Sequence, residues 1–142
     1  MTSPAGDAPL AWHEVVAGTP LRPFAVTISP AANERYWRAA GVDHPALRAG
    51  ACYPPIAANL TVLAFGRRCP EPVIQTRQRL VCHGRVEAGE PLVVTGRVLA
   101  RYEKRGRTYV DVRAHVATQA RPESVRWESE VTFTPAATLG AR

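Results

Sequence analysis

IAANLTVLAF, residues 56–65 of the 142-residue chain, is the stretch that decides the predicted fold. It follows Pro54 and Pro55, and its only polar residues are Asn59 and Thr61. A helix that is apolar on nearly every side has to be covered on more than one side. At about 1.5 Å per residue it spans roughly 15 Å, enough to cross one small sheet. We therefore expect a central helix that is buried all round.

Extended stretches lie on both sides of this helix in the sequence. One precedes it at 22–28, and four follow it at 73–83, 91–102, 108–118 and 125–134. Apolar and polar residues alternate most clearly in 91–102 and 108–118, and Gly106 in their short connector predicts a hairpin. Gly89 predicts a similar turn before residue 91. The pattern indicates an α+β domain, with an antiparallel meander wrapped around one long central α-helix.

A second, shorter helix is predicted from Ser29 to about Ala40. Ser29 is a good N-cap, Pro30 suits the first helical position, and Gly41 is typical of a helix end. The segment that follows, 42–55, is rich in turn residues and leads directly into the central helix.

Length and composition predict one globular domain. We expect a disordered lead-in at 1–9, a single domain at 10–135 and a flexible tail at 136–142. The apolar fraction of 46% and the charged fraction of 21% are ordinary for such a domain. The longest apolar stretch is shorter than a membrane span, so we expect a cytoplasmic protein with no membrane partner.

The net charge of +6 favours an acidic partner. Nucleic acid is not expected, because the basic residues are scattered along the extended stretches without interleaved aromatic residues. An acidic carrier protein or an anionic coenzyme A thioester satisfies the same electrostatics, and a general enrichment in arginine is the alternative. Cys52, Cys69 and Cys82 have no metal-ligand spacing, so reduced thiols and no metal site are predicted.

Three strings resemble the MaoC-like acyl-thioester dehydratases and hydratases. They are YWRAAG at 36–41 leading to DHP at 43–45, ACYPPI at 51–56, and RLVCHGRVEAGEPL at 79–92. The likeness spans about residues 20–135 and implies a hot-dog fold. It also implies a hydro-lyase that interconverts 3-hydroxyacyl and 2-enoyl thioesters on acyl carrier protein or coenzyme A, in fatty-acid or polyketide and polyene assembly. No cofactor is implied.

The string that bears the catalytic pair in this family departs from the pattern here. Members with hydratase activity carry Gly-Asp-x-Asn-Pro-Leu/Ile-His, whereas residues 41–47 read GVDHPAL. With Pro45 held in register, Val42 occupies the Asp position and Leu47 the His position. Neither side chain can exchange a proton. Asp43 and His44 are the right residue types at the wrong spacing.

Three interpretations of this departure remain open. In the first, the chain shapes the acyl tunnel while a partner hot-dog subunit supplies the Asp/His pair. In the second, a homodimeric hydratase or thioesterase uses His44 as its base, oriented by Asp43. In the third, the chain is a non-enzymatic subunit that binds acyl thioesters or acts as a scaffold. The smallest assembly expected is a dimer, with either a different hot-dog subunit or a second copy of this chain, because hot-dog sheets join edge to edge. The alternative for His44 is a purely structural role, in which it caps a turn and takes no part in catalysis.

The resemblance places the acyl site at the start of the central helix, where backbone N–H groups suit a thioester carbonyl. The residues expected to bind substrate are Tyr53, Pro54, Ile56, Ala57 and Asn59. Asn59, as a buried amide, bonds either a structural partner or the ligand. A basic cluster near the predicted hairpin is either a solvated turn or a contact for a carrier protein or phosphate. It comprises Arg101, Lys104, Arg105 and Arg107.

Overall fold

A computed structural model describes residues 9–69 and 72–133 of the chain. Nearly all of the predicted lead-in and all of the predicted tail lie outside the described residues. The helices are a short 3-10 turn at Trp12–Glu14, α1 (Pro30–Ala39), α2 (Pro45–Arg48) and α3 (Pro54–Arg68). The strands are β1 (Phe24–Thr27), β2 (Val73–Cys82), β3 (Pro91–Lys104), β4 (Arg107–Ala117) and β5 (Val125–Phe133). None of the helices described is long and apolar enough to cross a membrane.

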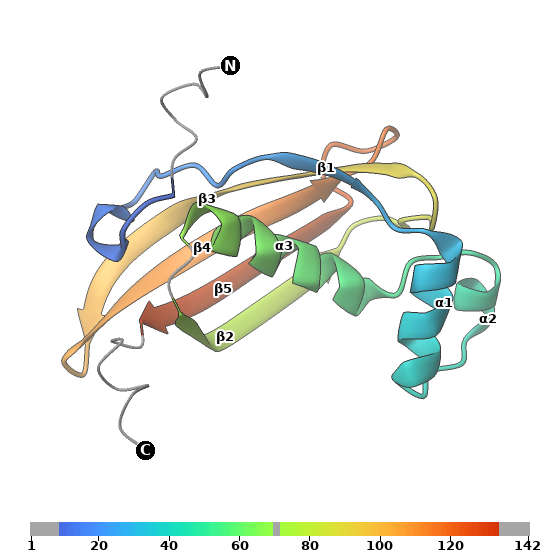
Figure 1. Ribbon diagram of the computed structural model, residues 1–142, viewed down its shortest axis with the longest axis horizontal. Coiled ribbons are helices and arrows are strands. Elements are labelled where there is room, and N and C mark those ends of the chain that lie inside the picture. The colour runs from blue at the N-terminus through green and yellow to red at the C-terminus, as the bar shows by residue number, and fades with distance from the viewer. Residues whose placement is uncertain (1–8, 70–71, 134–142) are drawn as a thin grey trace.

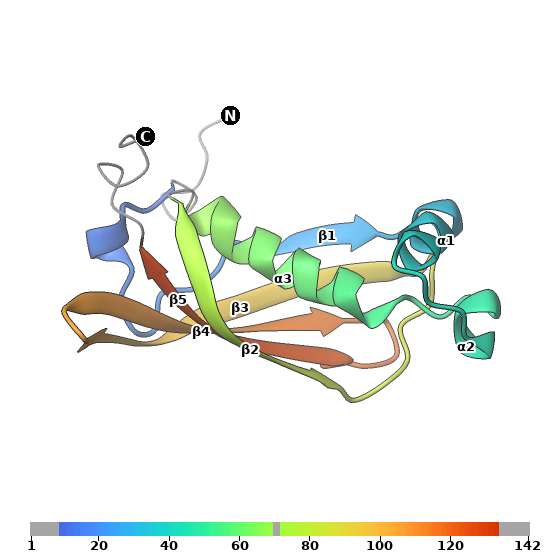
Figure 2. The same ribbon diagram turned by 90° about the horizontal axis from the view of Figure 1, so that it is seen from below.

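The five strands form one antiparallel sheet in the order β1-β3-β4-β5-β2. The long helix α3 lies across one face of the sheet, and α1 and α2 sit together beyond one end of it (Figures 1 and 2). We call the face toward α3 the inner face and the opposite one the outer face. The predicted α+β class, with one long helix against an antiparallel sheet, is confirmed.

The prediction of a simple meander is wrong for β2. Strand β2 lies at the edge of the sheet and pairs with β5, while β3 pairs with β1 and β4. Gly89 does sit in a turn, with φ +93°, but the connection from β2 to β3 crosses the end of the sheet instead of reversing beside its own strand. Alternation along a strand says which face a residue occupies, not which strand lies next to it.

The hairpin between β3 and β4 is confirmed, and it closes through two residues. Arg105 and Gly106 both have positive φ, 54° and 73°, as a type I′ turn requires. Alternation in β4 is also confirmed. Val110, Val112, Ala114 and Val116 are fully buried on the inner face and, with Trp127 and Val131 of β5, form the core under α3.

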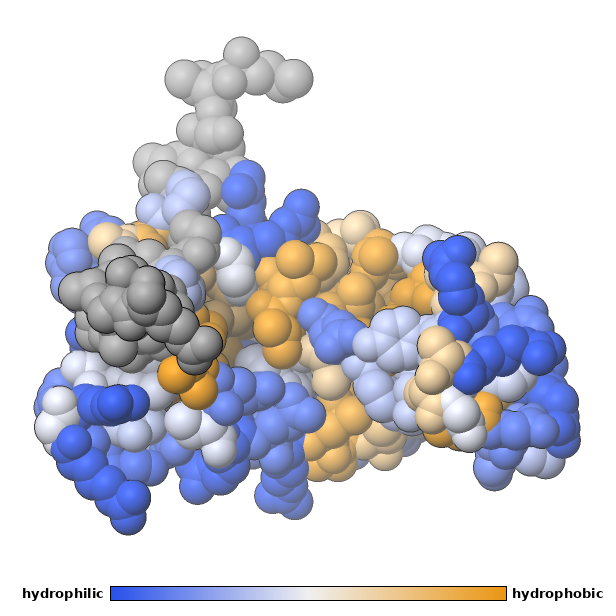
Figure 3. Space-filling model, turned by 60° about the horizontal axis from the view of Figure 1, so that its bottom comes forward, coloured by the Kyte–Doolittle hydropathy of each residue, from blue (hydrophilic) through white to orange (hydrophobic). Residues whose placement is uncertain are grey.

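The helix α3 is longer than predicted and is not buried all round. Pro54 and Pro55 belong to its first turn, where the missing N–H groups cost no intrahelical hydrogen bond. One side packs on β3 and β4, and Ala57, Thr61 and Ala64 are among the buried residues of the helix. The other side leaves Val62 43% and Leu63 50% exposed. Hydrophobic side chains gather in the middle of the face that carries α3 (Figure 3). The described residues therefore cover only part of this helix.

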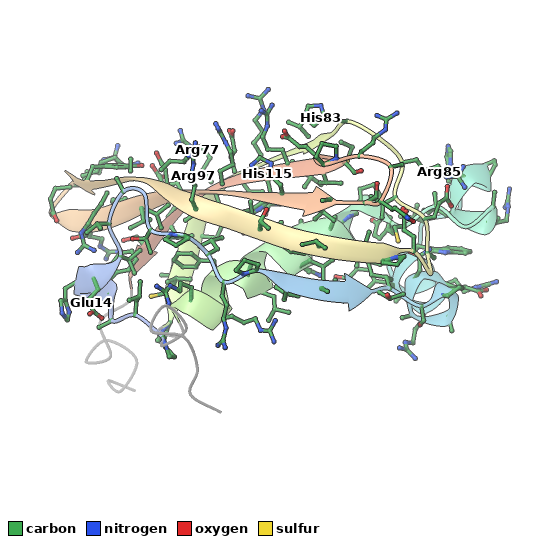
Figure 4. All side chains as sticks on the ribbon, turned by 90° about the horizontal axis from the view of Figure 1, so that it is seen from above. Glu14, Arg77, His83, Arg85, Arg97 and His115 are labelled. Carbon is green, nitrogen blue, oxygen red and sulfur yellow. The ribbon has the colours of Figure 1, made fainter. Side chains whose placement is uncertain are left out.

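The outer face of the sheet carries ion pairs. Arg77 and His115 lie on the side of the sheet away from α3 (Figure 4). Glu130 is buried there, 6% exposed, and accepts hydrogen bonds from the Tyr102 hydroxyl, from Thr76 Oγ1 at 2.7 Å and from Lys104 Nζ at 3.1 Å. Those donors hold the pKa of Glu130 at about 2, well below its ordinary value. The cluster ties β2, β3 and β5 together.

Candidate functional site

A cavity of about 560 Å³ lies at the end of the sheet near α2. One wall comes from segment 42–54, with Val42, Leu47 and Tyr53 among its side chains. The opposite wall is the β2–β3 connection at 82–86, and Ala57 of α3 and Val125 of β5 complete the lining. Most lining residues are apolar, and the basic ones, His44, His83 and Arg85, are exposed. The site is suited to an apolar group with a polar end at the mouth.

Backbone hydrogen bonds hold the two walls together. The Cys52 N–H donates to the Val86 carbonyl at 2.8 Å, and the Ala88 N–H donates to the Gly50 carbonyl at 2.9 Å. The Arg85 guanidinium adds a bond of 3.0 Å to the Ala49 carbonyl. The cavity is therefore bounded by two segments far apart in the sequence that are fixed against each other.

Asn33 of α1 is a site residue that the sequence analysis missed. It is 2% exposed, donates from Nδ2 to the Ala51 carbonyl at 2.9 Å, and accepts at Oδ1 from the Tyr53 N–H at 2.9 Å. Both hydrogen bonds go to the backbone beside Cys52, on the cavity wall. The available signal was an amide on the helix face that also carries Trp37, four residues later and likewise buried.

The two positions to which the resemblance assigns the catalytic pair, with Pro45 held in register, lie on the same cavity. Val42 and Leu47 both line it, and Leu47 is buried. His44 lines the same cavity, whereas Asp43 does not. The Asp43 carboxylate accepts from Arg48 Nη1 at 2.6 and 2.7 Å, and no hydrogen bond joins it to His44 in the described part of the chain.

His44 is the N-cap of α2, a helix that the sequence analysis left as a turn. Its Nδ1 accepts a hydrogen bond from the Ala46 N–H at 3.1 Å, and Pro45 occupies the first helical position. In the family string this position is Asn, which caps helices by the same acceptor chemistry. The side chain therefore has a structural role at the edge of the cavity.

The residues expected to bind substrate divide into two groups. Tyr53, Pro54 and Ala57 line the cavity, whereas Ile56 packs in the hydrophobic core. Asn59 is exposed, and its side chain donates to the Tyr36 hydroxyl. The expectation that Asn59 is a buried amide is wrong, because it lies on the uncovered side of α3.

The basic cluster does not act as one surface. Arg101 turns inward and donates to the Trp12 and Val15 carbonyls at 2.5 and 2.9 Å, and Lys104 is bound to Glu130. Arg105 and Arg107 are exposed at the hairpin. Val116 pairs with Val125 at the cavity end of the sheet. It lies nine residues along β4 from Arg107, so at about 3.3 Å per residue the hairpin is roughly 30 Å from the cavity.

Two thiols line the cavity. Burial, with the negative charges of Glu90 and Glu87 adding to it, raises the pKa of Cys52 to about 11. Burial also raises the pKa of Cys82, which is the more exposed of the two. Neither environment favours the thiolate that a nucleophile needs. Within 9–69 and 72–133, no three His, Cys, Asp or Glu side chains are grouped to hold a metal ion.

Comparison with known proteins gives structural likeness without sequence likeness. No family model and no curated protein matches the chain. An (R)-hydratase from A. caviae involved in PHA biosynthesis superposes with TM-score 0.72 at 16% identity, over 85% of this chain and 98% of that one. The HadBC 3R-hydroxyacyl-ACP dehydratase complex of Mycobacterium tuberculosis gives 0.68 at 20%, over 82% and 96%. A MaoC-like dehydratase from Rhodospirillum rubrum gives 0.70 at 17%, over 87% and 96%.

These likenesses confirm the predicted architecture. Each covers more than four fifths of both chains, so the match extends over most of the chain and not over one motif. The chain therefore has the hot-dog fold found in the MaoC-like hydratases and dehydratases.

Proposed function

We propose that the chain is a subunit of a 3-hydroxyacyl-thioester dehydratase or enoyl-thioester hydratase, and that it shapes the acyl-binding tunnel. A partner hot-dog subunit supplies the Asp/His pair. The thioester is carried by acyl carrier protein or coenzyme A, in fatty-acid or polyketide assembly. The (R)-hydratase and the dehydratases among the structural neighbours support a reaction of this class.

The observation that carries the proposal is the chemistry of positions 42 and 47. Both side chains line the cavity, and both are aliphatic. Dehydration of a 3-hydroxyacyl thioester needs a base for the C2 proton and an acid for the departing hydroxyl. Val42 and Leu47 supply neither, but they enlarge the apolar surface that an acyl chain would contact.

The uncovered side of α3 supports a partner subunit. Val62 and Leu63 leave apolar surface exposed to water. A second subunit that buried this surface would be stabilised by about 25 cal/mol for each Å² removed from water. Strand β2 is an edge strand of ten residues, which offers unpaired backbone groups to another sheet. The HadBC neighbour is described as a complex, which accords with assembly from more than one chain.

A self-sufficient homodimer, either hydratase or thioesterase, is the second candidate, because His44 lines the cavity. Its base would be His44, oriented by Asp43. Arg48 disfavours this candidate, because its Nη1 donates to both carboxylate oxygens of Asp43. A purely binding or scaffold role for the chain is the third.

Assays with and without a partner distinguish the three. The partner to test is the product of a neighbouring reading frame that carries an intact Asp-x-Asn-Pro-x-His string. We expect hydration of a 2-enoyl thioester only when both chains are mixed. Turnover by the chain alone would support the homodimer, and its absence in every mixture would support the scaffold role. The partner with its Asp and His replaced by Asn and Gln is the control.

A further inference from the structure

The hydrogen bond that His44 accepts fixes the chemistry of its ring. A neutral imidazole has one nitrogen that donates and one that accepts. Nδ1 of His44 accepts from the Ala46 N–H at 3.1 Å, so it holds no proton. The proton of the neutral ring is therefore on Nε2, and the N-cap bond selects this tautomer.

Among the described residues, no carboxylate is hydrogen-bonded to His44, so none favours a proton on Nδ1 instead. Asp43, adjacent in sequence, is engaged by Arg48 at 2.6 and 2.7 Å. A general base at His44 would need a free lone pair facing the substrate, and the lone pair of Nδ1 is already used by the backbone. The nitrogen that remains for a ligand is an N–H donor.

Of the three basic side chains that line the cavity, His44 alone faces no carboxylate of the described residues. The other two basic side chains of the lining face carboxylates, with His83 Nε2 at 3.6 Å from Glu123 and Arg85 paired with Glu87. Around His44 the wall consists of Val42, Ala46 and Leu47, which neither donate nor accept through their side chains.

We propose that His44 is a ligand-binding residue whose Nε2–H donates a hydrogen bond to the carbonyl oxygen of the bound thioester, and that it is not the base of this site. The inference rests on the proposed function, because it assigns the carbonyl end of the acyl thioester to the mouth of the cavity near α2. The acyl chain then extends along the apolar lining, which includes Leu47, Ala57 and Val86.

The tautomer is tested without any ligand. Histidine labelled with nitrogen-15 gives distinct long-range proton–nitrogen correlations for the two neutral forms, read at about pH 8, where an ordinary imidazole is neutral. The His44 signal is identified by its absence in His44→Ser, which keeps a capping side chain. We expect the Nε2–H form. The Nδ1–H form would overturn the inference, whatever the protein's function.

The ligand contact is tested with butyryl-coenzyme A labelled with carbon-13 at its carbonyl, added to the full chain. We expect the carbonyl stretch to lie lower in the wild type than in His44→Ser, and the Kd to rise about threefold to tenfold in the variant, the effect of one hydrogen bond. His13→Ser, an exposed histidine of the 3-10 turn, should leave both unchanged.

The outcomes separate the inference from the proposed function. If the Kd and the carbonyl stretching frequency of butyryl-coenzyme A are the same in the wild type and in His44→Ser, the His44 contact is refuted. The proposed acyl-thioester site is then unaffected. No binding of butyryl-coenzyme A by the wild type would refute both, even with the Nε2–H tautomer observed.

Discussion

The Tyr53 N–H donates a hydrogen bond of 2.9 Å to the side-chain oxygen of Asn33, a residue twenty positions earlier in the chain. Because Tyr53 is the N-cap of α3 and lines the cavity, this bond joins α1 to the start of the central helix. The amide nitrogen of Asn33 holds the Ala51 carbonyl at the same time, so both polar atoms of a buried side chain are satisfied.

Replacement of Asn33 by Ala should therefore lower both the stability of the protein and its affinity for a ligand in the cavity. We expect a loss of about 2–4 kcal/mol in the free energy of unfolding, because two buried hydrogen bonds are removed and two backbone groups lose their partner. Urea denaturation measures the loss. Asn59→Ala is the matched control, since Asn59 is exposed and its removal should cost less than about 0.5 kcal/mol. Equal effects for both variants would contradict the role assigned to Asn33.

The sequence was a good guide to local structure. The Ser29 cap of α1, the alternation of β4 and the turn at Gly106 were all predictable, because each depends on neighbours within a few residues. The position of β2 beside β5 was not, since pairing between distant strands leaves no local pattern. The uncovered side of α3 was misjudged for a related reason. An apolar helix predicts burial, but not whether its own chain or another one covers it.

The candidate site was predictable in part. Holding Pro45 in register led to Val42 and Leu47, and both line the cavity. The pairing of Asp43 with Arg48, the capping bond of His44 and the clamp at Asn33 depend on side-chain directions that the sequence does not contain.

Glu130 should make stability depend on pH in the acidic range. Its pKa in the folded protein is about 2, lowered first by the hydrogen bond from Tyr102, and an unfolded glutamate titrates near its ordinary value of 4.5. The stabilisation is therefore present above about pH 4.5 and is lost as the pH falls toward 2. Glu130→Gln should lower stability by about 1–3 kcal/mol at neutral pH.

Thermal denaturation across pH measures this effect. The difference in Tm between the wild type and Glu130→Gln should shrink as the pH falls through the acidic range. Glu103→Gln, at an exposed glutamate of β3, is the control and should show a smaller difference in Tm. A difference in Tm between the wild type and Glu130→Gln that stays constant at all pH values would refute the lowered pKa of Glu130.

The two cavity thiols should differ in reactivity. The pKa of Cys52, about 11, leaves about a hundredfold less thiolate at neutral pH than its ordinary value of 9.0 would. Cys82 is exposed, so iodoacetamide should label it first and reach Cys52 only on unfolding. Peptide mass spectrometry after timed labelling measures the order. Bound butyryl-coenzyme A should slow labelling of Cys82, and preferential labelling of Cys52 would contradict the burial of that wall.

The uncovered side of α3 should control assembly. We expect the chain, when mixed with its partner subunit, to sediment as a species heavier than its 15.4 kDa monomer, and Leu63→Glu to shift it toward the monomer, because a charge there would be buried on association. Val16→Glu is the control, since Val16 is also 50% exposed but lies outside α3. A wild type that stays monomeric in that mixture as well as alone, or equal effects of the two substitutions, would count against this surface as an interface.

Exchange of the C2 protons of 3-hydroxybutyryl-coenzyme A with heavy water, followed by NMR in the presence of the purified chain alone, tests the central claim most directly. Because Val42 and Leu47 cannot carry protons and His44 presents a donor, we predict that the thioester binds and that its C2 protons exchange no faster than in buffer. Rapid exchange catalysed by this chain by itself, and abolished in His44→Ser, would contradict the account.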